Sequence, residues 1–417
     1  MTSMAPAQVR LVEPEWVDIV PAPAHDSLTP KQRRQYLADN PNSYLGVTRS
    51  PEDAANGETW DAALAVANSR TSLQHLLDIG AFGPPLEPAY YLYRLSQGDH
   101  SQTGIVACVS IEDYDRGRVR IHEQIRAAQA NHLKAQLTGV GVQSSPIALA
   151  YRSDTMVEGL VARTLAETDP IIELTSADGV SQQVFRVETD VGQNMQSALA
   201  EQPLYLIDGH HRAAATSLAR AEGSSPGAEW MFCTIFSATD LRNEAFHRVL
   251  VGVEPSLLLA DVMKRFPTRE AAEIDEVLNR RADEVGLLTR SGQGQPQWHL
   301  VTLPALLDER LDIGVSAATP LLAELEPVRL CHHIIDPYFA DDGPGAGREP
   351  TINYLHGLGD RDDIERLTAE VSDPLWLMRP ISLETVMNAS DLGATLPAKS
   401  TYFQPKVRSG IFIRSMV

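Results

Sequence analysis

The chain has 417 residues, with 55 acidic and 35 basic side chains and a formal net charge of −20. So acidic a protein is not expected to bind nucleic acid or an anionic membrane, because phosphate-rich surfaces require a basic face. The 43% hydrophobic and 22% charged residues are typical of a globular protein with a large core, and the length predicts two or three domains.

The cysteines and the absence of apolar runs indicate the cell compartment. Cys108, Cys233 and Cys331 are far apart and lack metal-ligand spacing, which is typical of a reducing compartment. The first residues, 1–14, contain no segment of signal-peptide type, and no run has the length of a membrane span. We therefore expect a cytoplasmic protein without a membrane partner, and homo-oligomer formation stays open.

The N-terminal segment, residues 1–88, is expected to be an α/β region that packs on the core. A polar helix is predicted over Lys31–Asp39, and a strand over Tyr44–Thr48. Apolar residues at helical spacing predict an amphipathic helix over Trp60–Gly80.

The middle segment, residues 89–254, alternates short strands with helices and is expected to form the α/β core. Tyr90–Leu95 and Gly104–Ser110 predict two strands of a hairpin. Arg118–Glu123 predicts a short strand that runs into a polar helix over Gln124–Leu137. Further strands are predicted at Ile147–Tyr151, Ile171–Leu174, Val184–Val187 and Met231–Phe236, with a helix at Val157–Glu167.

The C-terminal segment, residues 255–417, is expected to be an α/β region that is mainly helical and contributes to the pocket. Helices are predicted over Pro255–Phe266, Ala271–Val285, part of Leu321–His333 and Asp362–Val371. Trp298–Leu303 and Leu375–Met378 predict strands.

We expect the chain to be organised around the stretch from Pro203 to Arg212 and the alanine-rich run that follows. Leu204–Ile207 predicts a buried strand, Asp208 and Gly209 break it, and the following alanines predict a helix that ends near Gly223. The first turn of a helix attracts anions, and here it carries His210, His211 and Arg212, which is suited to phosphate. The alternative is an ordinary helix with Asp208 as its N-cap and the His and Arg side chains at the surface.

At this point the chain resembles a known family, the bacterial and archaeal proteins catalogued as domain of unknown function 1015. That family is related to SerK-like free serine kinases of the ParB/sulfiredoxin-type fold. The resemblance rests on runs in a fixed order: Asn42–Leu45 with Val47 and Arg49, Tyr91–Arg94, Gln102–Tyr114, His122-Glu123, Ile207–Arg212, Phe246–Arg248, and Lys399–Phe403 with Pro405-Lys406. Family members usually carry Pro-Pro-Tyr-Asp near the N-terminus, where this chain has Pro-Ala-Pro-Ala-His-Asp at residues 21–26, so the resemblance assigns no role to that loop. The resemblance implies an α+β fold with a ParB/sulfiredoxin-like catalytic core that binds nucleotide phosphates.

The resemblance implies a small-molecule kinase that moves a phosphoryl group from ATP or ADP to a hydroxyl, with free L-serine as the expected acceptor. Phosphoryl transfer needs charge neutralisation, a metal and a base. The guanidinium group of Arg212 can donate two hydrogen bonds to phosphate oxygens, and Gly209 and His210 supply further backbone N–H donors. His211 is assigned to a hydrogen bond with the phosphoryl group in transfer. Asp208 is assigned to Mg²⁺. Glu123 is assigned as the base, and the alternative is a glutamate in the first turn of a helix.

Other polar runs are weaker candidates for substrate contacts. His247 and Arg248 either line the same pocket or bridge domains. Lys399, Ser400 and Thr401 suit a substrate carboxylate or phosphate, with structural packing as the alternative. Two further functions stay open: a nucleotide-binding regulator without catalysis, and a phosphohydrolase that uses water as the acceptor.

Overall fold

The computed structural model describes residues 2–53, 60–306, 320–357 and 359–417. The chain forms two compact units that are not consecutive in sequence. The first unit consists of Met1–Ile121, Ile125–Leu241 and Pro405–Val417, and the second of His122–Gln124 and Arg242–Gln404. The division into segments 1–88, 89–254 and 255–417 stays a prediction about folding domains.

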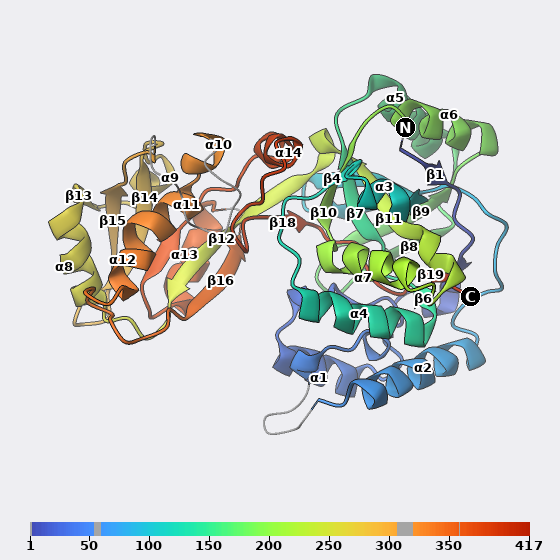
Figure 1. The fold of residues 1–417 in the computed structure, drawn as a ribbon, viewed down its shortest axis with the longest axis horizontal. Coiled ribbons are helices and arrows are strands. Elements are labelled where there is room, and N and C mark those ends of the chain that lie inside the picture. Colours follow the sequence, from blue (N-terminus) through green and yellow to red (C-terminus); the bar gives the residue numbers. More distant parts are fainter. Residues whose placement is uncertain (1, 54–59, 307–319, 358) are drawn as a thin grey trace. The chain divides into compact units, whose positions relative to one another are not determined.

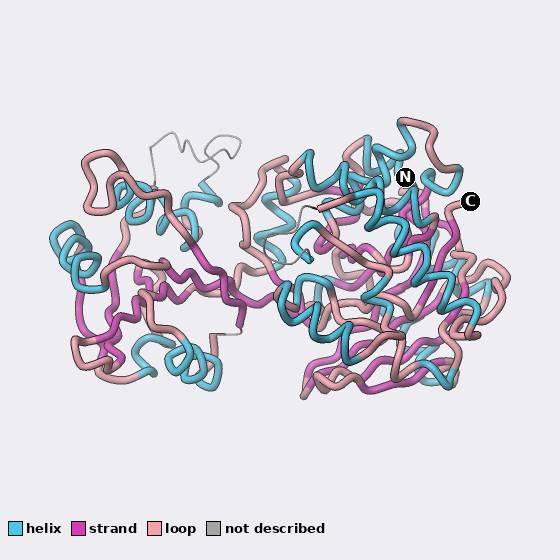
Figure 2. Tube along the Cα trace, turned by 90° about the horizontal axis from the view of Figure 1, so that it is seen from below, coloured by secondary structure: helices cyan, strands magenta, loops and turns pink. Residues whose placement is uncertain are grey.

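The first unit is built on a mixed sheet with the strand order β5-β10-β7-β11-β4-β3-β9-β8, in which β1 also pairs with β4. A smaller sheet has the order β2-β19-β6. Figure 2 shows these strands in magenta along the tube of the unit. The strands are β1 (Met4–Ala5), β2 (Arg10–Leu11), β3 (Tyr91–Gln97), β4 (His100–Ser110), β5 (Val119–Arg120), β6 (Val142–Gln143), β7 (Ile147–Tyr151), β8 (Ile172–Thr175), β9 (Ser181–Arg186), β10 (Leu204–Asp208), β11 (Trp230–Ser237) and β19 (Phe412–Ser415).

Helices cover this sheet in layers. Helix α7 contacts β7 and β11, α4 packs on α7, and α2 packs on α4, as Figure 1 shows for the green to blue helices of this unit. The α-helices are α1 (Pro30–Asp39), α2 (Ala62–Asp78), α3 (Ile111–Asp115), α4 (Ala127–Val140), α5 (Thr155–Glu167), α6 (Thr189–Leu199) and α7 (His210–Ala221). Short 3₁₀ turns are η1 (Pro14–Trp16), η2 (His25–Ser27), η3 (Tyr44–Gly46), η4 (Pro51–Asp53), η5 (Pro226–Glu229) and η6 (Ala238–Asp240).

The core of the first unit explains why β10 and α7 are held firmly. Leu204 and Leu206 of β10 and Ala213 of α7 lie in one buried cluster with side chains from β4, β11, α5 and α6. β10 is an interior strand, parallel to β5 and antiparallel to β7. Because both its neighbours and its apolar face are buried, the end of β10 has a fixed position relative to the sheet.

The second unit has its own sheet, with the order β13-β15-β14-β17-β12-β16 and with β18 also paired to β12. Successive residues of β12 contribute to different cores: Val249 packs with α9 and α13, and Leu250 packs with α8 and α11. Helices therefore cover both faces of this sheet. The strands are β12 (Arg242–Leu250), β13 (Thr268–Ala271), β14 (Glu284–Arg290), β15 (Pro296–Thr302), β16 (Ile352–Gly357), β17 (Leu375–Leu377) and β18 (Tyr402–Gln404). The helices are α8 (Pro255–Arg265), α9 (Ile274–Leu278), α10 (Pro320–Ala323), α11 (Glu326–Leu330), the π-helix η7 (Cys331–Ile335), α12 (Asp336–Phe339), α13 (Arg361–Glu370) and α14 (Leu383–Asp391).

The fold is α+β, as predicted, and several local predictions need correction. The C-terminal region, expected to be an α/β region that is mainly helical, has helices around the central sheet of the second unit. The predicted strand at Tyr44–Thr48 is wrong, since Tyr44–Gly46 is a 3₁₀ turn. The predicted helix over Ala271–Val285 is also wrong: only Ile274–Leu278 is helical, and a strand begins at Glu284. Among the residues that the structure describes, no helix combines the length and the apolar character needed to cross a membrane.

Candidate anion-binding site

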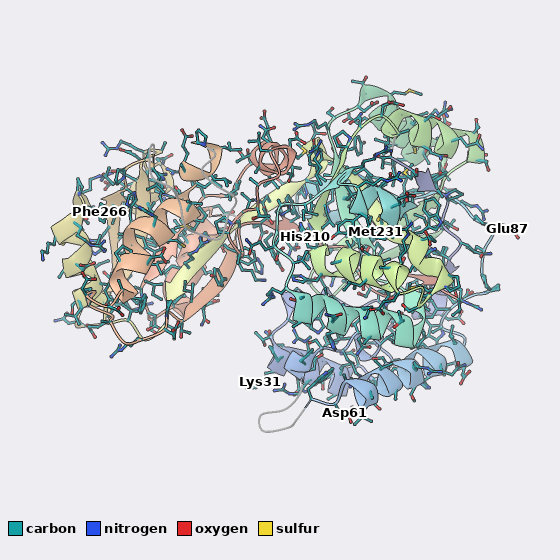
Figure 3. The ribbon with its side chains drawn as sticks, viewed as in Figure 1. Lys31, Asp61, Glu87, His210, Met231 and Phe266 are labelled. Carbon is teal, nitrogen blue, oxygen red and sulfur yellow. The ribbon has the colours of Figure 1, made fainter. Side chains whose placement is uncertain are left out.

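The junction between β10 and α7 has the strand–glycine–helix geometry that the sequence predicts. β10 ends at Asp208. Gly209 has φ +98° and ψ 27°, a left-handed backbone conformation that residues other than glycine rarely adopt. A Cβ atom on Gly209 would lie 2.9 Å from Arg212 Nη2, so a larger residue would also require the Arg212 side chain to shift. α7 begins at the next residue, His210, which Figure 3 labels. The N-cap is Gly209 without a side-chain cap, so the alternative of Asp208 as N-cap is wrong.

Asp208 is the centre of a small charged cluster. Its Oδ2 accepts from Arg212 Nη2 at 2.5 Å, and its Oδ1 accepts from Lys406 Nζ at 2.9 Å. One carboxylate faces two cations, so the cluster has a formal charge of +1 at the positive end of a helix. An anion is therefore attracted to this turn.

Arg212 is fixed from a second side by backbone carbonyls. Its Nη1 donates to the oxygens of Ser145 and Pro146 at 2.5 and 2.9 Å, just before β7. The side chain is still 29% exposed. A guanidinium held in this way loses little further rotational freedom when an anion binds, which favours binding.

Lys406 is a functional candidate to which sequence reasoning gave no role. It comes from the C-terminal segment of the first unit, and the oxygen of the preceding Pro405 accepts from Gln102 Nε2 at 2.9 Å. Only 9% of the Lys406 side chain is exposed, so losing its ion pair with Asp208 would be costly. The Pro405-Lys406 run was part of the family resemblance, and that was the available signal.

The two cations determine the ionisation of Asp208. Burial alone would raise its pKa, but the Lys406 ammonium and the Arg212 guanidinium outweigh burial and hold the pKa of Asp208 well below its usual range. The carboxylate is therefore ionised at neutral pH and keeps both cations aligned.

The histidines of the turn are buried. His210 is 3% exposed and His211 is 9% exposed. His211 Nε2 accepts from the backbone N–H of Arg126 at 3.1 Å, so in this geometry the proton of a neutral ring lies on Nδ1. His211 could reach a phosphoryl group from Nε2 only after giving up this bond.

The metal-ligand role expected of Asp208 stays a prediction. Both of its carboxylate oxygens face cations, and a magnesium ion there would have to displace Lys406 or Arg212. Within the described ranges, no group of three or more His, Cys, Asp or Glu side chains is arranged to hold a metal.

Glu123 lies outside both of its expected elements. β5 ends at Arg120, and α4 begins at Ala127 with Arg126 as its N-cap, so Glu123 is neither on a strand nor in the first turn of the helix. Its neighbour His122 is buried and shares a 3.1 Å hydrogen bond through Nε2 with Thr401 Oγ1. Glu123 therefore belongs to the second unit, whereas Asp208, Gly209 and Arg212 belong to the first.

The remaining predicted contact residues also lie in the second unit. His247 is fully buried: its Nδ1 accepts from the N–H of Met378 at 3.1 Å, and its Nε2 lies 3.4 Å from Asp363 Oδ2. Ser400 donates to the oxygen of Pro397 at 2.7 Å. These bonds favour structural roles for His247, Ser400 and Thr401.

Arg248 and Lys399 each lie close to an aromatic ring. Arg248 is 1% exposed beneath the ring of Tyr354. Lys399 is exposed, and its ammonium lies 5.3 Å from the centre of the Phe246 ring.

Comparison with known proteins shows the family. The model of the family described as "Protein of unknown function (DUF1015)" matches residues 5–315. The chain belongs to this family. The relationship that the ordered motifs predict is thereby confirmed. No curated protein matches this DUF1015 protein.

Solved structures give distant similarities to this DUF1015 protein. A mutant of free serine kinase in complex with ADP is similar at 12% identity and a TM-score of 0.38, over 75% of this chain and 92% of that chain. Free serine kinase in complex with AMP is similar at 13% identity and a TM-score of 0.36, over 75% of this chain and 91% of that chain. A conserved hypothetical protein from Pyrococcus furiosus is similar at 12% identity and a TM-score of 0.35, over 74% of this chain and 95% of that chain.

Proposed function

We propose that this DUF1015 protein is a small-molecule kinase that transfers a phosphoryl group from ATP or ADP to a hydroxyl, with free L-serine as the acceptor. The observation that carries the proposal is the turn at Gly209, where a helix start, Arg212 and Lys406 converge on Asp208. The ordered family motifs support the same function through their resemblance to SerK-like kinases. A ParB/sulfiredoxin-type core is part of this proposal.

The chemistry of the turn suits a phosphoryl donor. Phosphoryl transfer asks the protein mainly to position the phosphates and to neutralise their charge. Arg212, 29% exposed, can offer its remaining guanidinium N–H groups to phosphate oxygens, and the first-turn N–H groups of α7 have no acceptor within the helix. Lys406 and Asp208 hold the local positive charge in place.

The direct test is product formation. Purified protein is incubated with L-serine and ATP or ADP in magnesium-containing buffer, and O-phosphoserine is measured by mass spectrometry. Phosphoserine is expected in proportion to the protein added. Phosphate release that does not require serine would identify a hydrolase, and tight nucleotide binding without transfer to any hydroxylated amino acid would identify a regulator; either outcome refutes the kinase.

Nucleotide binding gives a second test that does not depend on the acceptor. Arg212→Ala removes a charged hydrogen-bond donor, which contributes about 1.5–3 kcal/mol, so ATP affinity should fall about 10- to 100-fold in calorimetry. Arg163→Ala is the matched control, because Arg163 lies on the exposed surface of α5 in the same unit and pairs only loosely with Glu167 at 4.0 Å. Equal affinities of the two variants would contradict a phosphate site at α7.

A further inference from the structure

The second unit contains a buried arginine in an unusual state. Arg248 lies on β12, between β16 and β17 in the sheet, and is 1% exposed. Over the residues that the structure describes, its Nε, Nη1 and Nη2 have no hydrogen-bond partner. The aromatic ring of Tyr354 lies next to it, with the ring centre 5.7 Å from the guanidinium carbon. A buried guanidinium without an acceptor is strongly unfavourable, because its hydration is lost without replacement.

Other buried arginines of the same unit have hydrogen-bond acceptors for their guanidinium groups. Arg280 donates to the carboxylate of Glu326 at 3.2 Å and to the oxygen of Val277 at 3.0 Å. Arg329 donates to the backbone oxygens of Leu303 and Ala282 at 3.2 and 2.8 Å. Arg248 lacks such bonds, although it is less exposed than either.

A second unpaired donor lies beside Arg248. Trp376 on β17 is the register partner of Arg248, and Tyr354 on β16 is its register partner on the other side, so the three side chains share one face of the sheet. Trp376 is fully buried, and its indole Nε1 also has no hydrogen-bond partner among the described residues. Both groups are donors, so the group missing at this position is an acceptor.

The nearby thiol does not provide the missing negative charge. Cys331 opens the π-helix η7, and π-helical turns often occur at functional sites. Burial raises the pKa of the Cys331 thiol, and the Arg248 guanidinium only opposes this shift in part. Cys331 is therefore a neutral thiol at neutral pH and leaves the charge of Arg248 uncompensated.

A second cation lies along the same face. Phe246 is two residues before Arg248 on β12, its ring packs edge-on against Tyr354 at 6.3 Å, and Lys399 Nζ lies 5.3 Å from its centre. Lys399 is exposed, and its backbone has φ +57°, a left-handed conformation that is rare for lysine. Glu244, two residues earlier, is paired with His356 Nδ1 at 2.8 Å. Lys399 and Arg248 therefore give this face an excess of positive charge.

We propose that Arg248 and Trp376 bind an oxyanion, the carboxylate or phosphate group of a small molecule, at a site in the second unit. The anion accepts from the guanidinium fork and from the indole N–H. Tyr354 is partly exposed on β16, at the edge of the sheet, and its ring must turn aside to admit the anion. This site does not depend on the proposed kinase activity.

Thermal stability provides the first test. Removing a buried charge that has no partner should stabilise the protein, whereas removing one partner of a buried ion pair should destabilise it. Arg248→Met replaces the guanidinium with an apolar side chain and should raise the melting temperature of the full chain in ligand-free buffer by several degrees. Arg280→Met is the matched control, and it should lower the melting temperature, because it leaves the buried Glu326 without this partner. A fall for Arg248→Met comparable to that for Arg280→Met would overturn the proposal.

Binding provides the second test. The Arg212→Ala protein, which lacks the main arginine of the first unit's turn, is titrated by calorimetry with inorganic phosphate and, separately, with succinate. Binding of either probe is expected and shows which oxyanion the site prefers. Adding Arg248→Met, or Trp376→Phe, which removes the indole N–H and leaves a smaller aromatic ring, should weaken that binding at least about tenfold. No binding of either probe, or binding that both additional substitutions leave unchanged, would overturn the proposal.

Discussion

Asp208→Asn tests the claim that one carboxylate organises the turn before α7. The substitution keeps the shape of the side chain and removes its charge. Lys406, 9% exposed, then remains beside Arg212 without the negative charge of Asp208. Stability should fall because the two cations repel each other and because Lys406 is largely desolvated.

The size of the effect follows from the two charged hydrogen bonds of Asp208. Each such bond contributes about 1.5–3 kcal/mol when well buried. Asp208 is 28% exposed, so solvent screening reduces the sum by roughly half. We therefore expect a loss of about 1.5–3 kcal/mol in the free energy of unfolding at pH 7.

The pH dependence gives a second, independent signature. The pKa of Asp208 is lower in the folded protein than in the unfolded chain, where it is about 3.9. The stabilisation is thus complete above about pH 4 and is lost as pH falls towards the folded-state pKa. The stability difference between wild type and Asp208→Asn should shrink by about 1.4 kcal/mol per pH unit below about pH 4.

The assay is urea unfolding followed by circular dichroism between pH 7 and pH 3. Asp99→Asn, at an exposed turn of the same unit, is the control and should change stability by less than about 0.5 kcal/mol. The reasoning is refuted if Asp208→Asn is as stable as the control at pH 7, or if its deficit stays constant down to pH 3.

Two further predictions concern the turn and the proposed base. Gly209→Ala should destabilise the first unit by about 1–3 kcal/mol in the same urea assay, because φ of residue 209 is +98° and the new Cβ would meet Arg212. The control is Gly159→Ala, inside α5, where no atom lies near the added Cβ. This variant should be neutral or stabilising by up to about 1 kcal/mol. Equal effects of the two substitutions would contradict the strained turn. Glu123→Gln should suppress phosphoserine formation at least about 100-fold, because a base acts on the acceptor hydroxyl. ATP affinity, measured by calorimetry, should be unchanged. Full turnover by this variant would show that Glu123 is not the base.

Local signals in the sequence were sufficient for the turn at Gly209. The apolar run Leu204–Ile207, the Asp-Gly break and the alanines after Arg212 specify strand, turn and helix from neighbouring residues alone, and the structure confirms them. The hairpin of β3 and β4 was predictable for the same reason.

Elements that depend on distant partners were not predictable in this way. Tyr44–Gly46 has the composition of a strand, but Ser43 Oγ accepts from the N–H of Leu45, and the N–H of Tyr44 donates to Val20, which holds the segment as a 3₁₀ turn. The helix predicted over Ala271–Val285 fails because Thr268–Ala271 pairs with β15 and Glu284 opens another strand of the same sheet.

Distance along the chain also hid the role of Lys406. It is 198 residues from Asp208, and no spacing rule connects two residues so far apart. A motif in the sequence can mark such a residue, but only the fold shows what it contacts.

The order of the two units along the chain has a consequence for biosynthesis. The first unit is interrupted after Leu241 and resumes only at Pro405, and this last piece supplies Lys406 and β19. A nascent chain emerging from the ribosome therefore cannot complete the charged cluster at Asp208 until almost all of the protein has been translated. Any fragment that stops before Pro405 would leave Asp208 with Arg212 but without Lys406, so the two units cannot be separated by one cut without damaging the earlier one.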